Sequence, residues 1–472
     1  MDLGGHDFLH MNKLAIKEHF DSIAESFDKD RSRFGYYHKC VFKIYKTFIP
    51  EGQNVLEIGC ATGDLLNALN PSRGVGVDLS DGMVNIASNK YPQLHFHVMS
   101  AEDLKLNEKF DYVLAANVLD YLEDIGSVLD NLKSMLVTDG KIVITLVNPI
   151  WELNFRFWER FYLKTPAPQK NLITNKDMVN LFETNGFEVI KERLGMFFPL
   201  NIPIISQVFN FIIPEIPMLR QLCAVQYIVA KPKRSKQALS CSVIIPCYNE
   251  KSNIADCLRR IPPMGVFTEA IVVDDGSTDM TSMMVCQDLN NAIRIKLISY
   301  QPNQGKGHAV KAGFDSAQGD VLMILDADMT VIPEDLPKFF KLFEEGKADF
   351  VNGTRMVYPM EKKAMNPVNY IGNKIFNLML SWIMEQRVSD TLCGTKAMFK
   401  KDYKKIHMND KSWGDFDLLF GAAKLCLKLR EVPIHYKMRI ADESKMKVIK
   451  HGWPLLMEVC QGMKELKFDK VC

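Results

Sequence analysis

The first residues that could do chemistry lie in a glycine-containing turn. The stretch at 55–63 reads VLEIGCATG, an apolar run followed by a turn with glycines at positions 59 and 63. Glycine allows the backbone to approach a ligand closely, and Asp78, about 20 residues after the turn, can accept hydrogen bonds from two ribose hydroxyls. The turn carries Ala61 and lacks the G-x-G-x-x-G pattern of dinucleotide sites. The spacing therefore predicts an adenosine-type pocket and disfavours NAD.

A second set of polar residues follows two later apolar runs. The sequences PCYNE at 246–250 and VDDGSTD at 273–279 each end a predicted strand. The carboxyl ends of parallel strands form the crevice in which open α/β sheets bind ligands. The glycine-rich turn NQGKGHA at 303–309 adds Lys306, which is suited to neutralise phosphate. Together these segments predict a site for the base, ribose and phosphates of a nucleotide.

Two aspartates close the next apolar run. Asp326 and Asp328 form an Asp-x-Asp pair at the end of DVLMILDAD, residues 320–328. At a strand end the backbone can turn, so that one carboxylate binds a metal while the other contacts sugar or a metal-bound water. Oxygen ligands favour Mg²⁺ or Mn²⁺, which would neutralise a departing nucleoside diphosphate. Without its context, such a pair is usually a solvated turn.

Apolar runs of strand length alternate with segments of helical length in both halves. In the first half the runs are 54–58, 73–77, 94–98, 110–115, 141–147, 187–190 and 225–230, and in the second half they are 242–246, 269–275, 295–300 and 320–328. This alternation predicts sheets of parallel strands with helices on both faces. The polar segment 232–240 has no apolar period and is interpreted as a linker. We therefore expect two doubly wound α/β domains in tandem, at 1–231 and 241–472.

The composition is that of an ordinary folded protein. The chain has 472 residues, of which 47% are hydrophobic and 24% charged, and this length is too great for one compact core. A formal net charge of +1 argues against a strongly basic nucleic-acid binder, so no nucleic-acid partner is expected. The eleven cysteines form no C-x-x-C pair, which indicates a reducing compartment, and the first residues lack the pattern of a signal peptide. We expect a cytoplasmic protein.

The first half resembles the class I S-adenosylmethionine-dependent methyltransferases over about residues 15–231. The resemblance rests on the glycine turn, on Asp78 at the end of a strand, on the sequence AED at 101–103 and on FDYVLAANVLDYLED at 110–124. For the methionine part of S-adenosylmethionine it implies contacts with Glu57, Gly59, Ala61 and Gly63. It implies that Asp78 holds the ribose, that Ala101 and Glu102 flank the adenine, and that Asn117 and Tyr121 line the methyl-donor mouth. No catalytic base stands out, because His95 and His97 are interpreted as structural or solvent-facing.

The second half resembles the family-2 glycosyltransferases of the GT-A fold over about residues 241–468. It is most similar to the branch of dolichyl- and polyprenyl-phosphate mannose or glucose synthases, because the motifs above occur in that order and DTLCGTK at 390–396 follows them. The resemblance implies nucleotide-sugar contacts by residues spread over the whole half: Pro246, Tyr248, Glu250, Asp275, Lys306, Asp326, Arg355, Arg439 and Lys445. It implies metal binding by Asp326 and Asp328, and Asp328 is also a predicted catalytic residue.

The motif at 390–396 differs from that of the synthases at its end. Asp390 is the candidate base, whereas the usual final Gly-Phe-Arg is replaced by Gly394, Thr395 and Lys396. Lys396 is the third predicted catalytic residue, since lysine can pair with an acceptor phosphate as a point charge, although it lacks the bidentate fork of arginine. Near Lys445 the sequence also departs from the family, so an exposed charged loop stays open as the alternative there.

Two apolar segments could rest on a lipid surface. Residues 194–214 carry no charge but include prolines at 199 and 203, so a straight spanning helix is not expected. Residues 366–386 place an apolar stripe at helical spacing: Tyr370, Ile371, Ile375, Phe376, Met379, Trp382 and Ile383. Such a stripe is most often core, but it is also typical of a helix lying on headgroups. Together the segments favour peripheral docking on the cytosolic face of a membrane.

These observations predict a bifunctional enzyme. One domain would transfer a methyl group from S-adenosylmethionine, and the other would carry out metal-dependent, inverting transfer of a sugar from a nucleotide sugar to a lipid-linked acceptor, either polyprenyl-phosphate-like or a glycolipid. Two alternatives stay open: both domains act on soluble small molecules, or one domain is a non-catalytic nucleotide-sensing or scaffold module. The complete Asp326/Asp328 pair and the intact Asp78 count against the second alternative.

Overall fold

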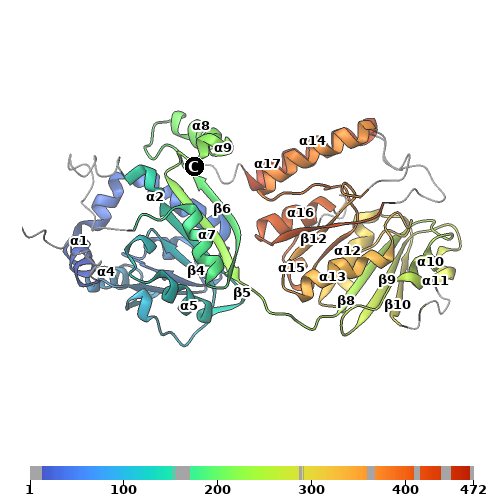
Figure 1. Ribbon diagram of the computed structural model, residues 1–472, viewed down its shortest axis with the longest axis horizontal. Coiled ribbons are helices and arrows are strands. Elements are labelled where there is room, and N and C mark those ends of the chain that lie inside the picture. Colours follow the sequence, from blue (N-terminus) through green and yellow to red (C-terminus); the bar gives the residue numbers. More distant parts are fainter. Residues whose placement is uncertain are drawn as a thin grey trace, which may run out of the picture. The chain divides into compact units, whose positions relative to one another are not determined.

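The computed structural model describes residues 13–152, 154, 171–285, 290, 292–358, 367–408, 415–436 and 448–467. The chain divides between Lys233 and Arg234 into two compact units, called unit 1 and unit 2 below. Within the described residues each unit holds one seven-stranded sheet with helices packed on it (Figure 1). The nine cysteines of these ranges are free thiols.

The sheet of unit 1 has the strand order β3-β2-β1-β4-β5-β7-β6. In chain order its strands are β1 (Asn54–Ile58), β2 (Arg73–Asp78), β3 (His95–Val98), β4 (Phe110–Ala116), β5 (Leu136–Val147), β6 (Phe187–Gly195) and β7 (Val225–Pro232). The first five strands run parallel, and β7 pairs antiparallel with β5 and β6. The strand order reverses between β1 and β4, so a ligand crevice is expected outside their carboxyl ends.

The helices of unit 1 include two that precede the sheet. They are α1 (Lys13–Arg33) and α2 (Gly35–Phe48), followed by α3 (Asp64–Ala68), α4 (Asp81–Lys90), α5 (Ile125–Met135), α7 (Asn175–Thr184), α8 (Ile205–Ile212) and α9 (Pro217–Arg220). Tyr45 of α2 is fully buried and donates a hydrogen bond to the carbonyl oxygen of Ala115, at 2.7 Å. This bond fixes α2 to the end of β4.

The sheet of unit 2 has the strand order β10-β9-β8-β11-β13-β12-β14. Its strands are β8 (Cys241–Cys247), β9 (Thr268–Asp275), β10 (Arg294–Tyr300), β11 (Val321–Ile324), β12 (Phe350–Thr354), β13 (Lys396–Phe399) and β14 (Leu429–Pro433). Strands β8 to β11 are parallel, whereas β13 runs antiparallel to both β11 and β12. Val243 and Ile244, adjacent in β8, belong to different hydrophobic clusters, so both faces of this sheet are covered.

The helices of unit 2 are α10 (Ile254–Arg260), α11 (Thr281–Val285), α12 (Lys306–Ser316), α13 (Leu336–Glu344), α14 (Pro367–Met384), α15 (Lys400–Tyr403), α16 (Asp415–Lys424) and α17 (Val448–Leu466). The two longest, α14 and α17, pack against each other (Figure 1). Among the described helices of both units, none combines the length and apolar character that crossing a membrane requires.

The prediction of two tandem, doubly wound α/β domains is confirmed. One predicted strand is shorter than expected, because β11 ends at Ile324 and leaves Asp326 and Asp328 in the loop beyond it. Strands β12, β13 and β14 were not predicted from the sequence.

Candidate active sites

Unit 1 contains a cavity of about 370 Å³ at the carboxyl ends of β1, β2 and β4. Seven residues predicted from the sequence line it: Gly59, Ala61, Asp78, Ala101, Glu102, Asn117 and Tyr121. Two others, Glu57 and Gly63, are not part of the described lining. The cavity therefore brings together most of the residues expected to contact S-adenosylmethionine.

The turn after β1 owes its shape to residues with positive φ. Gly59 has φ +66°, Ala61 +45° and Gly63 +80°. A Cβ at Gly59 would collide with the side chain of Val118, so the close approach of these two segments requires glycine. Glu57 is buried beneath the turn and accepts a hydrogen bond from the backbone N–H of Leu66 at 3.1 Å. In this position Glu57 supports the turn and does not face the cavity.

Asp78 and Glu102 are the acidic groups of the cavity. Asp78 accepts hydrogen bonds from the backbone N–H groups of Ala61 at 2.8 Å and Ser80 at 3.0 Å, yet burial raises its pKa. The pKa of Glu102 is lowered, because hydrogen bonds from Lys13 and Ser100 outweigh the opposing effect of burial. Glu102 is thus held as a carboxylate, whereas Asp78 takes up a proton at a higher pH than an ordinary aspartate does.

Aromatic residues of α1, of α2 and of the position between these helices form the part of the cavity wall that the sequence analysis missed. They are Phe20, Phe27, Phe34, Tyr37 and His38. The seven-residue spacing of the three phenylalanines was a signal that these helices turn one apolar face toward the domain. Helix α1 is anchored there by Asp28, which accepts a hydrogen bond from Thr62 at 2.7 Å.

Three polar groups lie near the predicted methyl-donor mouth. The Nδ2 group of Asn117 donates a hydrogen bond to the hydroxyl of Tyr37 at 3.2 Å, while Asn117 Oδ1 is buried without a partner among the described residues. Burial raises the pKa of Tyr37 to about 12 and lowers that of His38 to about 3. Neither group exchanges a proton readily near neutral pH, where an efficient general base would titrate.

In unit 2 the loops after β8 and β9 are joined by hydrogen bonds. The N–H of Asn249 donates to Ser277 Oγ at 2.9 Å, and the N–H of Glu250 donates to Thr281 Oγ1 at 3.0 Å. Tyr248, between β8 and these bonds, is exposed. Two strand ends that are separate in sequence are thereby joined into one continuous edge.

Asp275 connects this edge to the glycine-rich turn. Its buried carboxylate accepts hydrogen bonds from the backbone N–H groups of Gln304 at 2.7 Å and Gly305 at 2.8 Å. Gly305 has φ +97° and directly precedes α12, whose first residue is Lys306. Asp275 therefore sets the position of Lys306.

Lys306 lies against the Asp-x-Asp pair. Its ammonium nitrogen is 2.6 Å from Asp326 Oδ1, and the charge of Asp326 raises the pKa of Lys306 although burial opposes this shift. Asp328 accepts hydrogen bonds from the hydroxyl and N–H of Thr330, at 2.7 and 3.1 Å. A Cβ at Gly394 would collide with both Asp326 and Lys306. The loop after α14 thus meets the Asp-x-Asp loop at a glycine.

The carboxylates fit a divalent metal that substrate phosphates help to bind. No group of three potential His, Cys, Asp or Glu ligands occurs in the described part of the chain. Mg²⁺ is commonly bound through one or two carboxylates together with phosphate oxygens and water, so two aspartates at a strand end satisfy its requirement for protein ligands.

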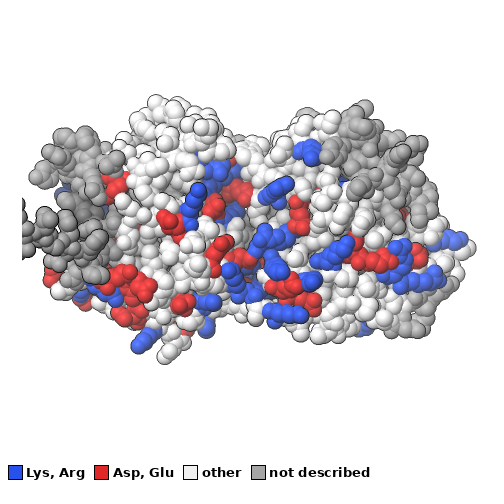
Figure 2. All heavy atoms as spheres, in the orientation of Figure 1, with Lys and Arg blue, Asp and Glu red and all other residues white. Residues whose placement is uncertain are grey.

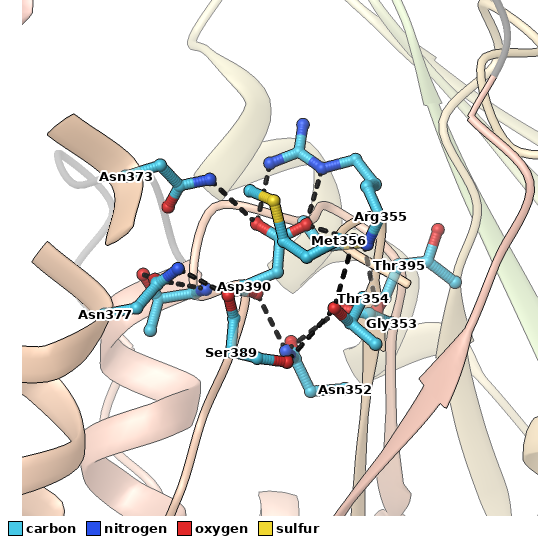
Figure 3. Close-up of polar contacts among 12 residues, drawn as sticks. Asn352, Gly353, Thr354, Arg355, Met356, Asn373, Asn377, Ser389, Asp390 and Thr395 are labelled. Atoms are coloured by element: carbon cyan, nitrogen blue, oxygen red, sulfur yellow. Dashed lines mark hydrogen bonds and ion pairs between the residues drawn. The ribbon is translucent and has the colours of Figure 1, made fainter. Parts of the chain in front are cut away.

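Asp390 is fully buried and forms a bidentate ion pair with Arg355 (Figure 3). Arg355 Nε is 2.7 Å from Oδ2 and Nη2 is 2.7 Å from Oδ1, and the backbone N–H of Arg355 also donates to Oδ2, at 3.0 Å. Burial alone would raise the pKa of Asp390, but the charge and hydrogen bonds of Arg355 lower it. A carboxylate with a low pKa and occupied oxygens is a weak base.

Three further predicted residues of unit 2 are Lys396, Arg439 and Lys445, and the structure describes the first of them. Lys396 is buried, and its ammonium group donates to the carbonyl oxygen of Cys393 and forms an ion pair with Asp415 at 3.2 Å. Its charge is therefore paired with Asp415 of α16, and its hydrogen bond to Cys393 closes the 390–396 segment. Arg439 and Lys445 lie outside the described residues.

The apolar stripe of α14 is divided between core and surface. Phe376, Met379 and Trp382 pack against the hydrophobic core of unit 2, and Ile383 is fully buried in it. Ile371, Ile375 and Leu378 are 60%, 56% and 72% exposed, and we call these three residues the outer stripe. The expectation that Phe376 and Trp382 face a lipid surface is thus corrected: the exposed stripe is displaced around the helix.

Unit 1 exposes a larger apolar surface on α8, α9 and the segments beside them. Its exposed members include Ile204, Ile205, Val208, Phe209, Ile212, Ile216 and Met218. Figure 2 shows the visible surface over α8 and α9 as almost entirely white, without charged side chains. An apolar patch of this kind marks a contact surface more often than an ordinary solvated one.

Comparison with known proteins gives a different family model for each half of the chain. Residues 31–192 match the family model described as a methyltransferase domain, and residues 242–406 match the model of glycosyl transferase family 2. A solved SAM-dependent methyltransferase, possibly a histamine N-methyltransferase, from Thermotoga maritima is similar with a TM-score of 0.37 and 18% identity, covering 46% of this chain and 99% of that one.

Two curated relatives match the second half. A dolichol-phosphate mannosyltransferase of Pyrococcus furiosus is 30% identical over 44% of this chain and 59% of its own length, so the chain spans only about three fifths of that protein. A dolichyl-phosphate hexose transferase of Haloferax volcanii is 30% identical over 43% of this chain and 86% of its own length. The second half of the chain therefore belongs to glycosyl transferase family 2, and it follows a methyltransferase domain in the first half.

Proposed function

We propose that the chain is a bifunctional transferase that methylates one substrate with S-adenosylmethionine and transfers a sugar from a nucleotide sugar to a lipid-linked phosphate. The observation that carries the proposal is the meeting of Lys306, Asp326 and Gly394, which joins the donor side of unit 2 to the 390–396 loop. We further propose residues 1–231 and 241–472 as the functional domains, with 232–240 as the linker. Residues 233–240 lack regular secondary structure, which supports this division.

In the methyltransferase domain, S-adenosylmethionine would occupy the cavity of unit 1. Asp78 would accept hydrogen bonds from the ribose hydroxyls, and the turn at Gly59 and Ala61 would contact the methionine part. The sulfonium methyl group is already electrophilic, so in-line transfer requires orientation and the exclusion of water. The aromatic wall from α1 and α2 supplies an apolar boundary for this purpose.

In the glycosyltransferase domain, the edge formed by Tyr248, Glu250 and Asp275 would hold the nucleoside. Lys306 would neutralise the diphosphate, and Asp326 with Asp328 would bind Mg²⁺ or Mn²⁺, which supplies further charge neutralisation for the leaving group. The acceptor oxygen attacks the anomeric carbon as the bond to the diphosphate breaks, which inverts the configuration.

The low pKa of Asp390 in its ion pair with Arg355 favours a phosphate as the acceptor. A phosphate oxygen is already ionised near neutral pH and needs no base, whereas a hydroxyl acceptor does. Because Arg355 lowers the pKa of Asp390, we propose that Asp390 orients Arg355 and that Arg355 faces the acceptor phosphate. The outer stripe of α14 and the apolar surface of α8 and α9 support peripheral contact with the membrane that carries such a lipid.

A donor screen tests this function. Radiolabelled nucleotide sugars are incubated with the full chain, Mg²⁺ and total lipid extract, and label entering the organic phase is counted. We expect transfer from one donor, and prior phosphatase treatment of the lipid should abolish it. Transfer that survives phosphatase treatment would point to a hydroxyl acceptor, and label confined to water-soluble products would favour a soluble acceptor.

A further inference from the structure

Helix α14 presents a row of polar side chains to the segment that contains Asp390. Asn373, Asn377 and Ser381 are spaced four residues apart and therefore lie on one face of the helix. Asn373 and Asn377 are about 95% buried. Figure 3 shows both asparagines reaching from the helix toward the segment around Ser389 and Asp390. A buried polar row next to a hydrophobic core is costly unless its hydrogen bonds are made.

Asn377 makes three such bonds to the segment. Its Oδ1 accepts hydrogen bonds from the N–H of Thr391 at 2.9 Å and from the hydroxyl of Thr391 at 2.7 Å. Its Nδ2 donates to the carbonyl oxygen of Ser389 at 2.5 Å. One side chain thus holds the backbone on both sides of Asp390.

Asn373 and Ser381 extend this connection in both directions. Asn373 Nδ2 is 3.3 Å from Asp390 Oδ1, the same oxygen that accepts from Arg355 Nη2. Ser381 exchanges two hydrogen bonds of 2.9 Å with the backbone of Val388. From Val388 to Thr391 the segment belongs to no helix or strand, so its backbone groups lack the hydrogen bonds of regular secondary structure. Side chains of α14 supply hydrogen bonds to several of these groups.

We propose that Asn373 and Asn377 are positioning residues for sugar transfer, through which α14 sets the location of Asp390 and thereby the direction of Arg355. This inference rests on the proposed glycosyltransferase function. It assigns no contact with donor or acceptor to either asparagine. The hydrogen bonds from Asn373 and Asn377 connect α14 to Asp390 and to the residues on either side of it.

Amide hydrogen exchange on the full chain gives a test that needs no substrate. In Asn377→Ala, peptides covering 386–395 should exchange about tenfold faster, because several hydrogen bonds to the segment are lost. Peptides covering 242–280 should be unchanged. Gly372→Ala is the matched control on the same helix, since a Cβ at that position meets no atom within 4 Å. Unchanged exchange at 386–395 in Asn377→Ala would overturn the inference.

Kinetics separate positioning from a general loss of structure. For Asn373→Ala and Asn377→Ala, kcat/KM for the lipid acceptor should fall about tenfold, while KM for the nucleotide sugar stays within about twofold. Thr391→Ser keeps the hydroxyl that bonds Asn377 and should retain activity, whereas Thr391→Val should lose it. Parallel losses in donor KM and thermal midpoint would mean that the asparagines only stabilise the fold. If the unaltered chain transfers no sugar, the proposed function fails, and the exchange result still decides whether α14 positions the segment.

Discussion

Lys306 and Asp326 form an ion pair of 2.6 Å at the meeting point of the two loops that hold donor and acceptor in the proposed reaction. Gly394 lies so close to both groups that it has no room for a side chain. In the proposed reaction the diphosphate would bind Lys306 and the metal would bind Asp326. Binding of the donor should therefore separate Lys306 from Asp326, because Lys306 exchanges Asp326 for the negatively charged diphosphate and Asp326 exchanges Lys306 for the positively charged metal.

Substituting Gly394 tests this arrangement. Gly394→Ala should reduce sugar transfer by about tenfold or more, because the new methyl group displaces the loop from Asp326 and small displacements of reacting groups are costly. The comparison is made by steady-state kinetics with Gly372→Ala as the control. If Gly394→Ala has full activity, the loop is not in this position during catalysis.

The sequence predicted most of the sheets because parallel strands are buried on both sides and appear as continuous apolar runs. Strand β13 escaped prediction because it is four residues long and contains the charged Lys396, which is buried with an ion pair to Asp415 and a hydrogen bond to the carbonyl oxygen of Cys393. The same limitation applies to the site. The resemblance to family-2 glycosyltransferases implied roles for Asp390 and Arg355, but no local pattern indicated that they bond each other, since 35 residues separate them. The roles of Asn373 and Asn377 likewise depend on contacts with a segment that follows their helix.

Removal of the metal or of its proposed ligand should stop turnover of the nucleotide sugar. Asp328→Asn keeps an acceptor for the Thr330 hydroxyl but removes the charge, and we expect a loss of about 10²-fold or more. Chelator should reproduce the loss in the unaltered protein, and added Mg²⁺ or Mn²⁺ should reverse it. Asp256→Asn, a change in an exposed ion pair with Arg260, is the control. Full activity in excess chelator would make the Asp-x-Asp pair structural.

Asp78→Ala should weaken binding of S-adenosylmethionine by about 1.5–3 kcal/mol, because a charge-assisted hydrogen bond to the ribose is lost. Isothermal titration calorimetry measures the change, with the exposed Asp103→Ala as the control. Burial raises the pKa of Asp78, and the carboxylate form is the one that accepts both hydroxyls, so affinity should fall as the pH is lowered through that raised pKa. Unchanged affinity in Asp78→Ala would exclude Asp78 from the site.

The Asp390–Arg355 pair should make stability depend on pH. The pKa of Asp390 is lower in the folded protein than the value of about 3.9 in an unfolded chain, so its contribution is present above pH 4 and is lost as the pH falls through the folded pKa. Asp390→Asn leaves Arg355 buried without its partner and should cost about 3–5 kcal/mol at pH 7. The difference from the unaltered protein should shrink below pH 4. Calorimetric melting of both proteins across this range checks the prediction, and a pH-independent difference would contradict it.

Membrane contact should depend on the outer stripe of α14 and not on the aromatic residues of its core side. Replacing Ile371, Ile375 and Leu378 together with serine removes exposed apolar area, each Å² of which contributes about 25 cal/mol at a headgroup boundary. Lys374, between them in the sequence, would add roughly 1 kcal/mol at an anionic surface. The triple variant should therefore float less with phosphatidylglycerol vesicles while keeping its thermal midpoint.

Phe376→Ser with Trp382→Ser is the contrasting variant. These side chains pack against the core, so the double change should lower the thermal midpoint. If the triple variant binds vesicles as the unaltered chain does, the apolar surface of α8 and α9 becomes the site to change next, through Ile204, Phe209 and Met218. If neither set of changes affects flotation, the proposal of peripheral docking is wrong.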